Sequence, residues 1–229
     1  MSQIKVELQE WMGSDRSIAE SAWTSSLTHQ IKNSKSDSDV ERVVKMLAEN
    51  KHSTPFESVI FKFWIKLPIA IDRQHMTHRI ASHNGMSARY RTMPREWLSL
   101  PEDVKHIMDK AIESDSNIFV KEYEDLCTKA NIWYENTIAY FKIREGKEIS
   151  NKEFKRIREF LRGVLPQHNM SERVTIFNLR SFANYQKLRN SEHAQPEIRQ
   201  IAELMLKEVK AKNIAPIAIE WLEKNNWDI

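Results

Sequence analysis

Residues 59–68 read Val-Ile-Phe-Lys-Phe-Trp-Ile-Lys-Leu-Pro, and this stretch decides the class of fold. The apolar side chains at positions 61, 63, 65 and 67 point one way, whereas Lys62 and Lys66 point the other. A period of two residues predicts a strand with one buried face. Pro68 ends the strand and suits the first turn of a following helix. Because the rest of the chain is mostly helical in pattern, an α+β fold is expected.

Helical periodicity accounts for most of the remaining chain. Capping boxes at Ser38–Glu41 and Ser150–Glu153 each predict the start of a helix. Apolar steps of three and four residues from Phe119 to Thr137 predict one long amphipathic helix. The inward positions expected are 40, 43, 44 and 47, then 119, 123, 126, 130, 133 and 137, then 154, 157, 160 and 161. A short strand over 173–177 and helices over 178–189 and 196–212 complete the prediction, the last with 198, 201, 205 and 209 inward.

The chain reads as one domain over residues 1–229, because no repeat, low-complexity tract or linker interrupts it. Its 35 Lys and Arg against 32 Asp and Glu give a charge of +3, so neither nucleic acid nor a membrane is an expected partner. No apolar run approaches the roughly 20 residues of a membrane helix, and the first residues lack a signal-peptide core. The single cysteine, Cys127, excludes an internal disulfide, so the reducing cytoplasm is the expected compartment.

Glycine is scarce, and its positions exclude two common phosphate-binding motifs. The four glycines are Gly13, Gly85, Gly146 and Gly163. Neither G-x-G-x-x-G nor G-x-x-x-x-G-K-[ST] can be written with them. An anion would therefore be held by side chains and helix ends.

The densest polar stretch runs from Asp72 to Arg91 and holds four arginines and three histidines but no Lys or Glu. We expect a helix carrying residues 74, 75, 78 and 79, a turn at Asn84-Gly85, and an alternating segment from Ser87 to Arg91. The arginine fork matches phosphate and the edge of a planar imide, and amides read the edge of a base or an isoalloxazine ring. The stretch predicts an anion or nucleotide site, with a solvated basic face as the alternative.

Two other polar groups are weaker signals by themselves. Arg180 and Asn184 lie four residues apart and share a helix face, either as ligand contacts or as ordinary exposed polar residues. His52 to Glu57 is either a ligand loop or a polar cap. His75 and His78 have the spacing of metal ligands, but nearby arginines would repel a dication, so no metal is expected. Cys127 reads as a small buried apolar residue rather than a nucleophile.

Three motifs together resemble the flavin-dependent thymidylate synthases. His78-Arg79, seven residues and then Ser87-Ala88-Arg89-Tyr90 is similar to the R-H-R-x7-S motif of that family. Residues 52–57, H-S-T-P-F-E, are similar to its H-x-[ST]-P-F-E-H segment. Asn178-Leu179-Arg180-Ser181, Asn184, Leu188-Arg189 and His193-Ala194-Gln195 resemble its N-x-R-S…N…L-R…H-A-Q block. The motifs occur in the family's order over roughly residues 50–209.

The resemblance implies a mostly helical α+β domain with a small antiparallel sheet, and an enzyme that methylates dUMP to dTMP. It implies FAD as cofactor, NADPH as the reductant of FAD, and 5,10-methylenetetrahydrofolate as the one-carbon donor. It further implies a homotetramer whose active sites are shared between subunits, and no need for an enzyme cysteine.

The resemblance also implies roles for individual positions. Arg189 would lie on the uracil ring and favour its N3-ionised form. The FAD contacts implied are Thr54, Thr77, His78, Arg79, Gly85, Asn178, Arg180 and Asn184. The dUMP contacts implied are Gln74, His75, Met76, Thr77, Gly85, Met86, Ser87, Ala88, Arg89, Arg162 and Arg189. His52 would face folate or nicotinamide.

The chain departs from the family motif at three positions. Thr77 stands where the first Arg is expected, Gly85 where Glu is usual, and His75 where Trp is usual. We hypothesise that Thr77 and Gly85 are a paired change, with His83 or Arg91 filling in. The departures leave two alternatives open: a related enzyme that methylates or hydroxymethylates another pyrimidine nucleotide such as UMP, and a non-catalytic nucleotide- or RNA-binding relative.

Overall fold

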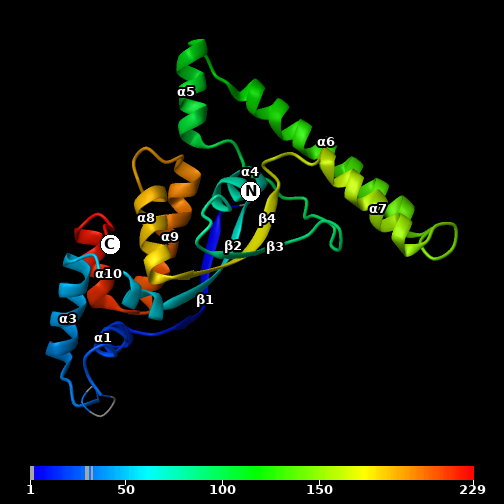
Figure 1. Ribbon diagram of the computed structural model, residues 1–229. Helices are drawn as coiled ribbons and strands as arrows, with labels where there is room; N and C mark the ends of the chain where they lie inside the picture. The colour runs from blue at the N-terminus through cyan, green and yellow to red at the C-terminus, as the bar shows by residue number, and fades with distance from the viewer. Residues whose placement is uncertain (1–2, 29–30, 32) are drawn as a thin grey trace. The chain divides into compact units, whose positions relative to one another are not determined.

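The structure is a computed structural model that describes residues 3–28, 31 and 33–229, and it contains a four-stranded sheet. Its strands are β1 (Lys5–Met12), β2 (Ile60–Pro68), β3 (Ser82–Gly85) and β4 (Met170–Asn178), in the order β1-β2-β4-β3 (Figure 1). The backbone N–H of Ile69 donates to the carbonyl of Asn169 (3.0 Å), and that of Leu179 to the carbonyl of Val59 (2.8 Å). These two bonds bracket β2 and β4 as an antiparallel pair. The α+β fold class with a small antiparallel sheet is confirmed.

Helices make up most of the described chain. The α-helices are α1 (Asp15–Trp23), α3 (Asp37–Glu49), α4 (Ile69–His75), α5 (Glu102–Ile112), α6 (Asn117–Lys142), α7 (Asn151–Leu161), α8 (Leu179–Arg189), α9 (Pro196–Ala211) and α10 (Pro216–Lys224). Two 3₁₀ turns, η1 (Thr54–Ser58) and η2 (Arg162–Val164), complete the set. Within the described ranges, no helix has the length and apolar character needed to cross a membrane.

The chain forms two compact units, and it passes between them within β2, α4, β3 and β4. The first unit contains Lys66–Asp72 and Gly85–Glu172, and the second contains Ile4–Ile65, Arg73–Asn84 and Arg173–Ile229. The arrangement as a single domain over 1–229 therefore stays a prediction.

The second unit has an aromatic core built on β2. Phe61, Phe63 and Ile65 are fully buried, as the alternating pattern predicts. Phe182 of α8 stacks on Phe63 with ring centroids 5.9 Å apart and meets Phe61 edge-on at 5.1 Å. Figure 1 shows α8 and α9 side by side in this unit. The helix over 196–211 is confirmed with its four predicted inward residues buried. This core fixes α8, which carries much of the candidate site.

The first unit has its own core between α6 and α7. Tyr134 and Ile138 of α6 pack with Phe154 and Leu161 of α7. The long helix is confirmed, but its predicted inward stripe is wrong: Phe119, Leu126 and Trp133 are 46%, 67% and 46% exposed. The buried positions, 127, 131, 134 and 138, lie one residue further along, which is about 100° around a helix. Phe160 is 73% exposed, so its predicted inward position on α7 is also wrong.

Several predicted boundaries differ from the structure. The cap of α3 is Ser36, whose hydroxyl accepts from the Asp39 N–H (3.2 Å), so the predicted box at Ser38 is two residues late. The box at Ser150 and Glu153 is confirmed. In α3 the buried residues are 40, 44, 47 and 48, while Val43 is half-buried.

The Asp72–Arg91 stretch is less regular than predicted. Pro68 is the last residue of β2, and α4 ends at His75, so His78 and Arg79 lie beyond the helix. Asn84-Gly85 belongs to β3 rather than to a turn. The segment from Ser87 to Arg91 is a turn, in which the N–H groups of Tyr90 and Arg91 both donate to the Ser87 carbonyl at 3.1 Å. Short polar segments carry weak periodicity, and pairing with β4 decides the conformation here. The elements β1, α1, α5 and α10 were not predicted.

Candidate active site

A buried imidazole lies at the centre of the polar residues in the second unit. His75 ends α4 and is fully buried. Its Nδ1 lies 2.8 Å from the Tyr185 hydroxyl on α8, and its Nε2 lies 2.9 Å from the Thr175 hydroxyl on β4. Burial lowers the pKa of His75 well below its usual range, and the neighbouring His83, Arg173, His78 and Arg189 lower it further. His75 is therefore a neutral hydrogen-bonding residue at neutral pH.

The hydrogen bonds continue from His75 to His83 and assign the ring tautomers. His83 Nε2 lies 3.1 Å from the His78 carbonyl, which can only accept, so this nitrogen carries a proton. His83 Nδ1 lies 3.2 Å from the Thr175 hydroxyl. Because His75 is neutral, a ring that accepts from the Tyr185 hydroxyl at Nδ1 donates to the Thr175 hydroxyl from Nε2. Burial raises the pKa of Tyr185, which keeps this phenol protonated.

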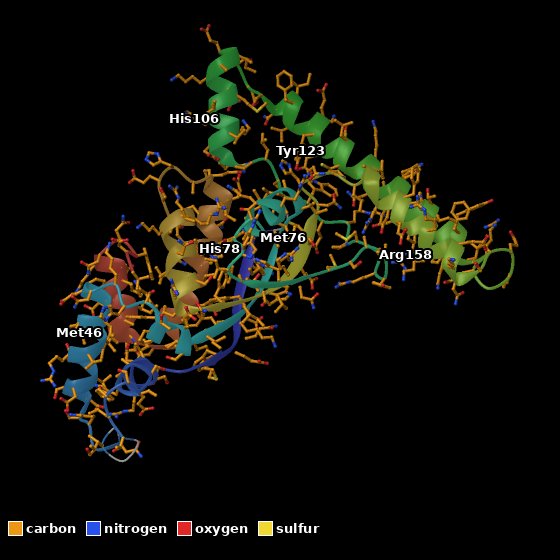
Figure 2. The ribbon with its side chains drawn as sticks, viewed as in Figure 1. Met46, Met76, His78, His106, Tyr123 and Arg158 are labelled. Carbon is orange, nitrogen blue, oxygen red and sulfur yellow. The ribbon has the colours of Figure 1, made fainter. Side chains whose placement is uncertain are left out.

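His78 is buried although it lies outside a helix. It is 5% exposed and lies beside α8 (Figure 2), where its Nε2 is 3.0 Å from the Ser181 hydroxyl. The Ser181 hydroxyl donates to the Ile80 carbonyl, so it accepts from His78. Burial lowers the pKa of His78, and the charge of Arg189 adds to that effect, while a hydrogen bond at Ser181 opposes it. The predicted cofactor residue His78 is thus held rigidly against α8.

Arg189, the predicted catalytic residue, is held by the predicted contact residue Thr77. Its Nη2 donates to the Thr77 hydroxyl at 2.8 Å, and that hydroxyl donates to the Gln74 carbonyl at 2.7 Å. The Nε of Arg189 and the Oε1 of Gln74 are both buried and have no hydrogen-bond partner among the described residues. A buried polar atom without a partner costs stability, so each marks a place where a ligand can supply the missing bond. Met76 is 42% exposed next to Thr77 in the chain.

Three predicted cofactor residues line one pocket of about 360 Å³ in the second unit. Asn178 caps α8 by accepting from the Ser181 N–H at 2.8 Å, and Arg180 and Asn184 project from the same helix. The other lining residues are Glu57, Ile80, Ser181, Lys187, Trp227, Asp228 and Ile229. Arg180 pairs with Glu57 at 2.8 Å, and Asp228 pairs with Lys187 at 2.8 Å and with Lys51 at 2.5 Å. The predicted contacts Thr54 and Arg79 are exposed and do not line this pocket.

The remaining predicted dUMP residues belong to the first unit. Arg89 pairs with Glu159 of α7 at 2.6 Å, and Arg162 is exposed at the start of η2. Ser87 accepts from the Arg89 N–H at 3.3 Å. Met86 and Ala88 pack on the core between α6 and α7, and Gly85 ends β3. Thus Gln74, His75, Thr77 and Arg189 are brought together in the second unit, while residues 85–89 and 162 lie in the first.

The sequence analysis did not identify several polar residues that the structure singles out in the two units. Tyr185 lies midway between Ser181 and Arg189 at four-residue spacing, so the shared face of α8 was a usable signal. Thr175 gave no signal, because its partners are about a hundred residues away in the chain. In the first unit, Arg158 of α7 (Figure 2) has buried Nε and Nη2 atoms without partners in the part of the chain described here. Across the described residues, no group of three or more metal-ligating side chains occurs. Cys127 is buried as predicted, and burial raises the pKa of its thiol.

The α+β fold brings buried imidazoles and a pocket of amide, guanidinium and carboxylate groups into one unit, an arrangement that suits a polar small molecule. Residues 7–217 match the family described as thymidylate synthase complementing protein. The flavin-dependent thymidylate synthase of Kosmotoga olearia is 34% identical over 224 residues, which cover 94% of this chain and 88% of that protein. That of Thermotoga neapolitana is 30% identical over 211 residues, 90% and 86% of the two chains.

Similarity in structure agrees with similarity in sequence. A UMP/dUMP methylase, PolB, from Streptomyces cacaoi, solved with 5-Br dUMP bound, matches with a TM-score of 0.73. The match covers 97% of this chain and 96% of PolB at 22% identity, which supports the fold alone. The chain belongs to the flavin-dependent thymidylate synthase family, as its three motifs predict. Its assignment as a methyltransferase enzyme of the thymidylate synthase type is confirmed at the level of this family.

Proposed function

We propose that this chain methylates dUMP to dTMP, with 5,10-methylenetetrahydrofolate as the one-carbon donor and NADPH-reduced FAD as the source of electrons. The observation that supports a nucleotide substrate most directly is the pair of buried, unpartnered atoms on Arg189 and Gln74. Arg189 Nε is a donor and Gln74 Oε1 is an acceptor. The imide edge of uracil offers the complementary carbonyl acceptors and N3–H donor.

Arg189 supplies a fixed positive charge for this proposed substrate. No carboxylate pairs with it in the described part of the chain, and its Nη2 donates to the neutral hydroxyl of Thr77. An uncompensated cation in a partly buried site stabilises negative charge that develops on a ring such as uracil when N3 loses its proton. His75 is neutral and does not supply this charge.

The pocket on α8 fits a flavin nucleotide. Asn178 and Asn184 present two amides to a pocket of about 360 Å³, and Arg180 adds a guanidinium that is paired with Glu57. These groups suit the polar edge of a ring system. We assign FAD to these residues, with Thr54, Thr77, His78, Arg79 and Gly85 as further proposed contacts. Bound FAD would supply the electrons that convert the transferred one-carbon unit to a methyl group.

The proposed assembly is a homotetramer in the cytoplasm. The proposed dUMP contacts of the second unit are Gln74, His75, Met76, Thr77 and Arg189, and those of the first unit are Gly85, Met86, Ser87, Ala88, Arg89 and Arg162. The exposed apolar residues of α6, including Leu126 and Trp133, offer a surface for contact between copies. Neither nucleic acid nor a membrane is proposed as a partner.

The first test is to purify the protein and supply FAD, NADPH, methylenetetrahydrofolate and dUMP. The purified protein should show flavin absorbance, and the product should have the mass of dTMP. Protein that stays colourless after incubation with FAD would contradict the proposal. Turnover with UMP but not with dUMP would assign the chain to a related methylase, and a product that is heavier by one hydroxyl oxygen would assign it to a hydroxymethylase.

Arg189→Ala tests the proposed catalytic residue. Turnover should fall by about a hundredfold or more, because an electrostatic contact to developing charge is lost. Flavin absorbance per chain should be retained, because the pocket residues are unchanged. Arg199→Ala on α9 is the matched control, since it removes a partly exposed arginine that pairs only with Glu203 at 3.7 Å. Activity of the Arg189 variant within a few-fold of the parent would show that this role is wrong.

A further inference from the structure

We propose that Thr77 is a positioning residue for Arg189, and that its hydroxyl fixes the guanidinium for the nucleotide. This inference rests on the proposed function. The Thr77 hydroxyl is used in both directions: it accepts from Arg189 Nη2 at 2.8 Å and donates to the Gln74 carbonyl at 2.7 Å. It therefore joins the end of α4 to the last turn of α8 through two bonds on one oxygen.

The two bonds give the Arg189 side chain a defined place. An arginine side chain has many rotamers, and fixing one of them costs conformational entropy. Because the Thr77 hydroxyl is itself held by a backbone carbonyl, it does not rotate away when it accepts from Arg189. The bond to Nη2 leaves Nε buried and unpartnered within the described chain, so it is free for a ligand acceptor.

A second bond joins α4 to α8 one helical turn before Arg189. Tyr185 is one helical turn before Arg189 on α8 and is fully buried, with its hydroxyl bonded to His75. The pair of His75 and Tyr185 therefore holds α8 against α4 at this turn, and the Thr77 hydroxyl holds the guanidinium that follows it.

These bonds to α8 give a structural role to two departures from the family motif. Thr77 stands where an arginine is expected and His75 where a tryptophan is expected. Both departures make contacts that lead to α8: Thr77 to Arg189, and His75 to Tyr185. A guanidinium at position 77 would place a second cation beside Arg189, whereas a hydroxyl accepts a bond from it. The structure thus pairs Thr77 with Arg189, while the pairing with Gly85 stays a prediction.

Thr77→Val and Thr77→Ser distinguish the effect of the hydroxyl on kcat from the effect of the side-chain shape. Valine keeps the branched shape without the hydroxyl, and serine keeps the hydroxyl. In Thr77→Val, kcat should fall by about 10- to 100-fold, as expected for a lost hydrogen bond to a charged group. Thr77→Ser should recover kcat to within about threefold of the parent. The midpoint of thermal unfolding should stay close to that of the parent in both.

Thr137→Val is the matched control. The Thr137 hydroxyl on α6 donates to the Trp133 carbonyl at 2.7 Å, which reproduces the backbone bond of Thr77 without an arginine partner. Its kcat should equal that of the parent. Full activity in Thr77→Val, or equal losses in Thr77→Val and Thr77→Ser, would overturn the positioning role.

A binding cycle tests whether Thr77 acts through Arg189 and does not depend on turnover. The affinity for dUMP is measured by calorimetry for the parent, Thr77→Val, Arg189→Ala and the double variant. Thr77→Val should weaken binding when Arg189 is present and have no effect in Arg189→Ala. Additive losses would overturn the inference even where dTMP is formed. A parent that binds no dUMP and forms no dTMP would instead overturn the proposed function, and the inference with it.

Discussion

At the scale of the residue, His75 shows how burial converts an ionisable side chain into a neutral structural one. Both ring nitrogens have hydroxyl partners, Tyr185 and Thr175, which serve a neutral imidazole well. A protonated ring would need an acceptor at both nitrogens, next to the charge of Arg189. The tautomer of His75 is therefore tied to the state of its neighbours, and its protonation opposes the fold.

Stability should fall as the pH is lowered from neutral, and His75 should cause part of the fall. Burial depresses its pKa in the folded protein, while the unfolded chain has the ordinary value of 6.5. The stability that neutral His75 contributes is fully present above the pKa of the unfolded chain. It is lost as the pH falls towards the lower pKa of the folded protein. Each such imidazole adds at most about 1.4 kcal/mol per pH unit to the slope. Urea unfolding at several pH values between about 7 and 5 measures it.

His75→Gln should flatten this slope, because glutamine keeps polar partners for Tyr185 and Thr175 but does not titrate. His78, whose pKa burial also lowers, remains and leaves part of the slope. Ile65→Val is the control, because Ile65 is fully buried on β2 in the same unit. Its substitution lowers the free energy of unfolding without removing an imidazole. A slope in His75→Gln as steep as that of Ile65→Val would refute the assignment.

At the scale of the element, local sequence signals worked where one element is determined by its own residues. The cap of α7 at Ser150 and that of α8 at Asn178 were both predictable, because capping depends on atoms a few residues apart. The alternation of β2 likewise determined its buried face. The long helix α6 was predictable as a helix, but its buried face was not, because the wider apolar stripe is the exposed one.

The start of α3 gives a direct test of such a signal, since the predicted and observed caps differ by two residues. Ser36→Ala should lower the free energy of unfolding by about 1 kcal/mol, because it removes the acceptor for the Asp39 N–H. Ser38→Ala should cost less than about 0.5 kcal/mol, because its hydroxyl contacts the Ser36 hydroxyl at 2.8 Å and caps no backbone N–H among the described residues. Urea unfolding of the two variants compares them, and a larger loss for Ser38→Ala would restore the predicted cap.

At the scale of the whole molecule, the chemistry-bearing residues were predictable by motif, but their grouping was not. Arg189 and Thr77 are far apart in sequence, and nothing local indicates that one donates to the other. Tertiary contacts of this kind depend on how α4 and α8 pack, which no periodicity encodes. The same holds for His83, expected to compensate for Thr77, which instead contacts Thr175 and the His78 carbonyl.

The exposed stripe of α6 has a consequence for assembly. Leu126 is 67% exposed and Trp133 is 46% exposed on one helix, while Ile118 and Ile143 near its ends are also exposed. Apolar side chains at this density on a surface favour burial against another molecule. If the proposed homotetramer uses α6, a charge on this stripe should weaken it, because burying an unpaired carboxylate is costly.

Leu126→Glu should therefore reduce the molar mass in solution, measured by light scattering, from that of four chains to that of smaller species. Asn136→Glu is the matched control, because it adds the same charge at an exposed polar position of the same helix and should leave the mass unchanged. Both variants should keep the far-ultraviolet circular dichroism of the parent, since neither residue is in the core between α6 and α7. An unchanged mass for Leu126→Glu would remove α6 from the interface. A parent mass equal to one chain would contradict the proposed tetramer itself.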